Sequence, residues 1–226
     1  MLMKRLLLTL LAALALPTAV NSETYLRLGV GSLKKDKTTT EHFSTGASDP
    51  PVLQKVIGEM NFEDGLLGDI AIGKEFKNFR GEISFQYHKG KLGDTYASAD
   101  GITIKTITND PQVNNLALMA IFYKDFYKEK KISPYLGIGF GYSHFLIDDS
   151  ETTVGSYTEN VDNEASNSFA YTFKGGMNYQ INNKFGLFGE ISYLSPIDLR
   201  GKTTQSEINF SEIDSYVIST GIKITL

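Results

Sequence analysis

The residues between Arg80 and Lys89 alternate strictly between two chemical classes. Ile83, Phe85 and Tyr87 occupy one set of alternate positions. The intervening positions carry polar or charged side chains, namely Arg80, Glu82, Ser84, Gln86 and His88. Because successive side chains of a β-strand point to opposite faces, this segment predicts a strand with one apolar and one polar face. A helix would mix the two classes on each of its faces.

Seven further segments show the same alternation and are spread along the rest of the chain. They cover residues 26–31, 66–76, 114–124, 134–145, 169–180, 185–193 and 216–226. Most are about ten residues long, the length of a tilted strand that crosses a bilayer. In the segment 134–145, Gly137, Gly139 and Gly141 fall on one face, which predicts close packing on that side.

The connections between the eight segments alternate between short and long. The short ones lie around 77–79, across 125–133 and at Asn182-Asn183, a pair that tolerates the positive φ of tight hairpins. The long, polar ones cover 34–65, 90–113, 146–167 and 195–213. This arrangement predicts an all-β fold: an eight-stranded antiparallel up-and-down transmembrane β-barrel with short periplasmic turns and four long extracellular loops. A soluble barrel would also alternate, but the charges and glycines on the non-apolar face favour the membrane barrel.

The first 22 residues differ in composition from the rest of the chain. Lys4 and Arg5 precede an apolar stretch at 6–16 that only Thr9 interrupts, and small residues follow Pro17. This layout predicts a secretory signal over residues 1–22 and an outer-membrane barrel domain over residues 23–226. The apolar stretch is shorter than the roughly 20 residues that a spanning helix needs.

Charge and composition exclude several classes of function. The 22 basic and 26 acidic residues give a net charge of −4, whereas nucleic-acid binding needs a basic face. The chain has no Cys, so disulfides, catalytic thiols and thiolate metal sites are excluded.

Three stretches of the sequence resemble a known family. They are PYLGIGFGYS at 134–143, FAYTFKGGMNYQINNKFGLFGEISYLS at 169–195 and YVISTGIKITL at 216–226. With them the mature part resembles the opacity-protein and surface-antigen group of small outer-membrane β-barrels. The resemblance implies a place in the bacterial outer membrane, contact with its lipid, and insertion by the outer-membrane assembly machinery.

One feature departs from this family. The assembly machinery reads a C-terminal strand that usually ends in an aromatic residue, and this chain ends in Leu226. Members of the group serve in adhesion, immune interaction and small-solute passage, so the fold does not select a function.

Eight charged residues are expected to point into the barrel. They are Arg27, Asp69, Glu75, Arg80, Glu82, Lys174, Glu190 and Lys223. Four are basic and four acidic, and single buried charges are costly, so we expect them to pair across a lumen that side chains can fill. The alternative is that they line a gated path for ions or small solutes.

The sequence offers little for catalysis. His42, His88 and His144 are the only imidazoles, and Ser143 and His144 are adjacent in a strand, so they face opposite sides. We expect no catalytic residue, no metal site and no cofactor. The acidic run after Leu146 matches no defined calcium loop. Apolar residues between Val52 and Met60 recur at helical spacing, which predicts a short amphipathic helix on the barrel rim.

Together these features predict a non-enzymatic outer-membrane surface protein that displays long loops to partners which the sequence does not identify. The alternative is a narrow channel for ions or small solutes. A third reading is a soluble periplasmic barrel that binds an apolar ligand.

Overall fold

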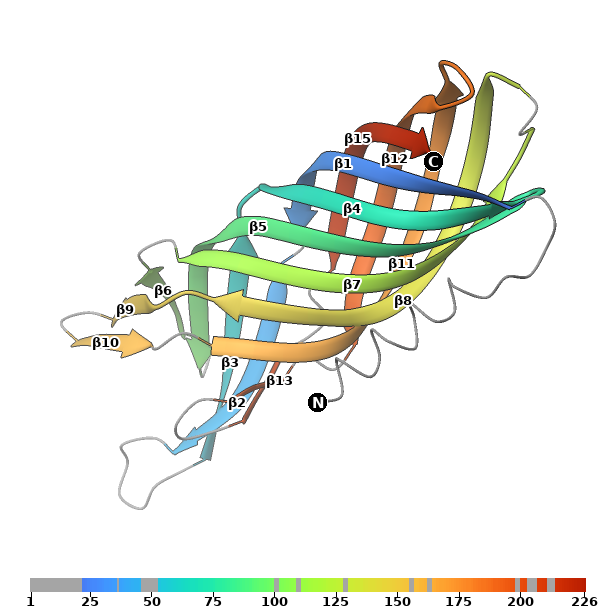
Figure 1. Ribbon diagram of the computed structural model, residues 1–226. Coiled ribbons are helices and arrows are strands. Elements are labelled where there is room, and N and C mark those ends of the chain that lie inside the picture. The colour runs from blue at the N-terminus through green and yellow to red at the C-terminus, as the bar shows by residue number, and fades with distance from the viewer. Residues whose placement is uncertain are drawn as a thin grey trace.

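A computed structural model describes residues 22–35, 37–45, 53–99, 102–108, 111–127, 130–154, 157–161, 164–197, 200–202, 207–210 and 214–226. The predicted signal at 1–22 therefore lies outside the described residues except for Ser22. The described residues form β-strands and no α-helix, and they include no helix long and apolar enough to cross a membrane. The strands belong to one fifteen-stranded sheet (Figure 1).

Eight of these strands close into an antiparallel barrel. They are β1 (Glu23–Lys35), β4 (Gly65–Phe76), β5 (Phe79–Ala99), β7 (Gln112–Asp125), β8 (Ile132–Ile147), β11 (Glu164–Gln180), β12 (Phe185–Ile197) and β15 (Ser215–Thr225). Each pairs with the next, and β15 returns to β1 along a register from Tyr25↔Thr225 to Lys35↔Ser215. Closure pairs the backbone groups of every wall strand, as a hydrocarbon environment demands. The predicted fold class is confirmed.

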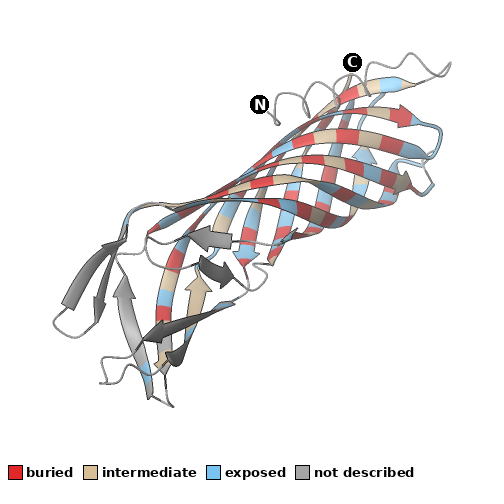
Figure 2. Cartoon of the chain, turned by 90° about the horizontal axis from the view of Figure 1, so that it is seen from below, coloured by how far each residue is buried: buried red, intermediate tan, exposed pale blue. Residues whose placement is uncertain are grey.

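The two faces of the wall follow the predicted alternation. Along the barrel strands buried and exposed residues alternate as bands (Figure 2). In β5, Glu82 is 2% exposed and points inward, whereas Phe85 is 49% exposed and points outward. The exposed outer positions are mostly large apolar side chains, which fits a wall covered by lipid.

Two of the short turns are closed in different ways, one by a side-chain hydrogen bond and one with a residue of positive φ. Between β11 and β12, Asn182 Oδ1 accepts hydrogen bonds from the backbone N–H groups of Lys184 and Phe185, both at 2.9 Å. Neither Asn182 nor Asn183 uses the positive φ that this pair tolerates: among the described non-glycine residues only Tyr127, between β7 and β8, has one, at 54°. An Asn side chain that bonds the following backbone closes the turn without it.

The long connections contain strands of their own. They hold β2 (Thr38–Thr45), β3 (Leu53–Phe62), β6 (Ile102–Thr108), β9 (Ser150–Val154), β10 (Tyr157–Val161), β13 (Arg200–Lys202) and β14 (Glu207–Phe210). In Figure 1 the labelled members of this set lie at one end of the barrel, where β5 continues past the wall. We call these strands and the outer part of β5 the extracellular extension.

The amphipathic helix predicted between Val52 and Met60 was wrong, because residues 53–62 form strand β3. This strand pairs with β2 on one side and with the outer part of β5 on the other. Residues 57–60 pair with a strand on each side, and this tertiary pairing overrides the helical spacing of the apolar residues.

Aromatic side chains gather on the outer wall across β8, β11, β12 and β15. Tyr193 of β12 lies between Tyr171 of β11 and Tyr216 of β15, with ring centroids 6.0 and 5.3 Å apart. Tyr142 of β8 packs edge-on against Phe169 of β11. Such belts mark the boundary between hydrocarbon and headgroups, here on the side of the extracellular extension.

The inward glycines of β8 leave room for side chains of β7. A Cβ at Gly137 would lie 2.5 Å from the Tyr123 ring, and one at Gly141 would lie 2.8 Å from the Met119 Cα and still closer to the Leu118 carbonyl oxygen. The close packing predicted for this face follows, because backbone and large side chains occupy the space that a methyl group would need.

Gly141→Ala should therefore destabilise the barrel, by about 1–3 kcal/mol as for other overpacked cores. Gly189→Ala is the matched control, because a Cβ at Gly189 has no atom within 4 Å. Urea unfolding of both variants in phospholipid vesicles tests this. Equal unfolding midpoints for the two variants would contradict it.

Candidate functional site

The eight predicted lumen charges all point inward and are buried. None is more than 7% exposed. They come from β1, β4, β5, β11, β12 and β15, which the closed topology brings around one narrow lumen. All eight contact an opposite charge within this set at 3.9 Å or less. Arg80 also has a partner outside the set.

Glu82 is the centre of the first half of this network. Its carboxylate accepts hydrogen bonds from Arg27 at 3.3 Å and Arg80 at 3.4 Å. The hydroxyl groups of Tyr25 and Tyr123 donate to it at 2.7 and 3.1 Å. Four donors to one buried carboxylate compensate for its lost hydration, which is the condition under which a buried charge is tolerated.

Glu190 is the centre of the second half. Arg27 Nη2 lies 2.8 Å from one of its oxygens, and Lys174 Nζ lies 2.8 Å from the other. The Tyr135 hydroxyl donates to the same carboxylate at 2.9 Å. Lys174 also lies 3.9 Å from Asp69. Arg27 thus links the two carboxylate centres into one continuous network across the lumen.

The network ends toward the periplasm in two further contacts. Arg80 Nε lies 3.3 Å from Asp125, and Lys223 contacts Glu75. Both acidic residues, with Lys223, line a polar vestibule of about 330 Å³ at the short-turn end. The periplasmic end of the network therefore lines this vestibule.

Sequence reasoning missed four members of the network. Asp125 was assigned to a turn but ends β7, and Tyr25, Tyr123 and Tyr135 were not placed in the lumen as ligands of the charges. Residue parity could have found Tyr25, which precedes Arg27 by two positions. The tyrosine rings also hold the cations: the Arg80 guanidinium lies 4.1 Å from the Tyr123 ring centroid and 4.4 Å from that of Tyr135.

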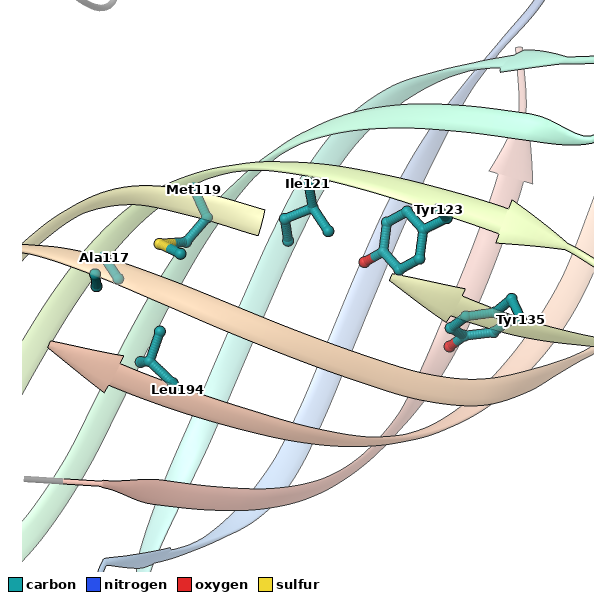
Figure 3. Packing of buried hydrophobic residues seen from close by; sticks show 7 residues of the cluster. Ala117, Met119, Ile121, Tyr123, Tyr135 and Leu194 are labelled. Carbon is teal, nitrogen blue, oxygen red and sulfur yellow. The ribbon is translucent and has the colours of Figure 1, made fainter. Parts of the chain in front are cut away.

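Apolar side chains fill the lumen beside the charges. Figure 3 shows Met119, Ile121 and Leu194 in the same inward cluster as Tyr123 and Tyr135. Closer to the extracellular end two more buried clusters follow, Leu33, Leu67 and Val217 in one and Leu92, Val113 and Phe145 in the other. Charged and apolar layers together fill the barrel, as expected for eight strands.

The histidines and serines do not form a catalytic couple within the described residues. Buried His88 faces the lumen with Nε2 3.4 Å from Gln86, whereas His144 faces outward and contacts Asn167 at 2.7 Å. Ser143 points inward and donates to Asn115 at 2.6 Å. His42 lies in β2, and its side chain is outside the described part. The described residues contain no group of three potential metal ligands.

The closed eight-stranded wall and its filled lumen agree with one protein family. The family model "Outer membrane protein beta-barrel domain" matches residues 6–222. The chain belongs to this family. It is therefore a bacterial outer-membrane protein in contact with lipid.

Solved structures share the fold at low sequence identity. The neisserial surface protein A is 12% identical with a TM-score of 0.53, covering 92% of this chain and 100% of that one. The outer membrane protein OprG from Pseudomonas aeruginosa is 12% identical with a TM-score of 0.56, covering 91% and 97%. The outer membrane protease OmpT from Escherichia coli is 9% identical with a TM-score of 0.51, covering 92% and 99%. No curated protein matches the chain in sequence.

We predict that the lumen network carries much of the stability of the barrel. Glu82→Gln removes the negative charge between Arg27 and Arg80 and should lower the free energy of unfolding by about 3–5 kcal/mol, because it leaves buried cations uncompensated. Unfolding by urea in vesicles measures this change.

The control is Glu59→Gln in the extracellular extension, which breaks the exposed pair of Glu59 with Lys37 at 2.9 Å. Exposed pairs are screened by solvent, so this variant should unfold like the wild type. If both substitutions had the same small effect, the network would not stabilise the barrel.

Proposed function

We propose that this protein is a non-enzymatic surface barrel that uses a closed, rigid wall to display the extracellular extension to partners outside the cell. The observation that carries the proposal is the combination of a lumen crossed by paired charges with the wall strand β5, which continues past the barrel into the extracellular extension. Residues 1–22 then act as the export signal, and the C-terminal strand β15 is what the outer-membrane assembly machinery reads during insertion.

The extracellular extension offers a surface suited to binding. A hollow of about 440 Å³ lies over β2, β3, β5 and β6, and its lining includes Lys37, Glu59, Asn61 and Tyr96. Charges of both signs, an amide and an aromatic ring provide hydrogen bonds and a stacking surface in one place. Binding residues often lie on connections held by a rigid scaffold.

The absence of catalysis in this proposal rests on the placement of the side chains. His88 contacts Gln86 and His144 contacts Asn167, and neither contact is to a serine hydroxyl. The likeness to the protease OmpT is a likeness of fold at 9% identity, and fold alone does not transfer an activity.

Surface display predicts a specific pattern of chemical labelling. Because the chain has no Cys, single cysteines can be introduced without background. Lys37→Cys, in the extracellular extension, should react on intact cells with a maleimide too large to cross the outer membrane. Asn183→Cys, in the turn between β11 and β12, should react only after that membrane is permeabilised. The reverse pattern would show that the barrel is inverted.

The channel alternative is tested by conductance. We expect no steady conductance step from the purified protein in a planar bilayer, because the paired charges leave no aqueous path. A steady step that changes in Glu190→Gln or Lys174→Gln, but not in Lys37→Gln outside the lumen, would instead support a channel.

A further inference from the structure

A groove of about 350 Å³ lies on the lipid-facing side of the wall, across β15, β1, β4 and β5. Its lining includes Leu28, Val30, Ile70, Phe85 and Tyr87. Apart from Asp69, whose side chain points into the lumen, the residues that line this groove belong neither to the lumen network nor to the extracellular extension. We propose that it binds one acyl chain of an outer-leaflet lipid, and that Lys34 and Lys89 bind the phosphate of the same lipid.

The groove exists because one outward position lacks a side chain. Gly68 in β4 pairs with Val30 in β1 and Tyr87 in β5, so it lies between two large outward residues. A Cβ at Gly68 would have no atom within 4 Å. The hydroxyl group of Tyr87 donates to Asn114 at 2.8 Å, which holds its ring as a fixed side wall.

The position of the groove in the wall selects a lipid chain as its occupant. Phe85 and Tyr87 lie six and eight residues from Phe79 at the periplasmic turn. At about 3.4 Å per residue and a tilt near 40°, this places them about 16–21 Å above that turn. The apolar band of such barrels is about 25 Å tall, so the groove faces the outer leaflet.

Size and shape suit one chain. With a water molecule taking about 30 Å³ and a methylene group a similar volume, the groove has room for about a dozen methylene groups. Lipid tails are as apolar as the wall, so the hydrophobic effect does not favour this position over bulk lipid. The preference of an acyl chain for the groove comes from van der Waals contacts, since the residues that line an unfilled groove lack the dispersion attraction that the chain supplies.

Two lysines lie at the height of the headgroups above the groove. Lys89 follows Tyr87 by two residues on the outward face of β5, and Lys34 follows Val30 by four on that of β1. Both side chains are exposed, and β4 with its Gly68 lies between their strands. Cationic side chains at this boundary attract anionic headgroups, so a phosphate above the acyl chain would complete the site.

The test uses the full-length mature protein in detergent, titrated with lipid A and followed by native mass spectrometry. The wild type should retain one lipid A. Gly68→Leu should weaken this binding at least about tenfold, because the new side chain fills the groove. Gly189→Leu is the matched control, since Gly189 faces outward on β12 with the same open space and should bind as the wild type does.

The headgroup is tested with the double variant Lys34→Gln, Lys89→Gln. It should bind lipid A more weakly and dephosphorylated lipid A as the wild type does. Unchanged lipid A binding in Gly68→Leu, or equal loss in Gly189→Leu, would overturn the acyl-chain site. Unchanged binding in the lysine variant would overturn the phosphate site. A dimer that disappears in Gly68→Leu would make the groove a contact between two copies of the chain and would also overturn the proposal.

Discussion

Inside a bilayer no water can hydrogen-bond to the backbone, so every N–H and C=O group of the wall needs a partner within the protein. The pairing of β15 with β1 closes the sheet and thereby removes its unpaired edges. Closure at eight strands then fixes a narrow lumen, which leaves space for side chains and little else. The eight charges of the lumen network find opposite charges within that space, whereas the buried Lys35 lies over the rings of Phe62 and Phe145. The bridging position of Arg27, between Glu82 and Glu190, follows from this geometry, because only a long side chain with several donors reaches two carboxylates at once.

The lumen is packed by pairing the largest inward side chains with the smallest. Tyr123 of β7 lies against Gly137 of β8, and Tyr135 of β8 lies against Gly176 of β11. The glycines give the rings room, and the rings bring their hydroxyl groups to the carboxylates of Glu82 and Glu190. The same tyrosines therefore fill the lumen and donate hydrogen bonds to its carboxylates. The charges depend on the tyrosines, and the tyrosines depend on the glycines.

Strict alternation allowed the sequence to predict the wall and the inward direction of all eight lumen charges. It did so because a strand fixes side-chain direction by position alone, with little influence from neighbours. Tyr123 escaped prediction because tyrosine suits both a lipid boundary and a polar interior. Tyr135 falls on the glycine face of its segment, but residue type did not reveal that its hydroxyl group binds a carboxylate. Residues 53–62 were predicted wrongly for another reason: their local spacing favoured a helix, and the partner strands β2 and β5 that favour β3 are distant in sequence. Which strands pair with β3 depends on the tertiary fold. The spacing of apolar residues along the sequence contains no information about that pairing.

The continuity of β5 through the membrane and into the extracellular extension has a consequence for binding. This strand runs for 21 residues, and its outer part pairs with β3 and β6. A flexible loop loses conformational freedom when it binds a partner, and that loss opposes association. A connection already ordered as a sheet has lost this conformational freedom during folding. More of the free energy of its contacts with a partner therefore contributes to affinity. If the extension binds a partner, as we propose, the rigid barrel anchors the sheet, and substitutions in the extension would change what it binds while the lumen network stays intact.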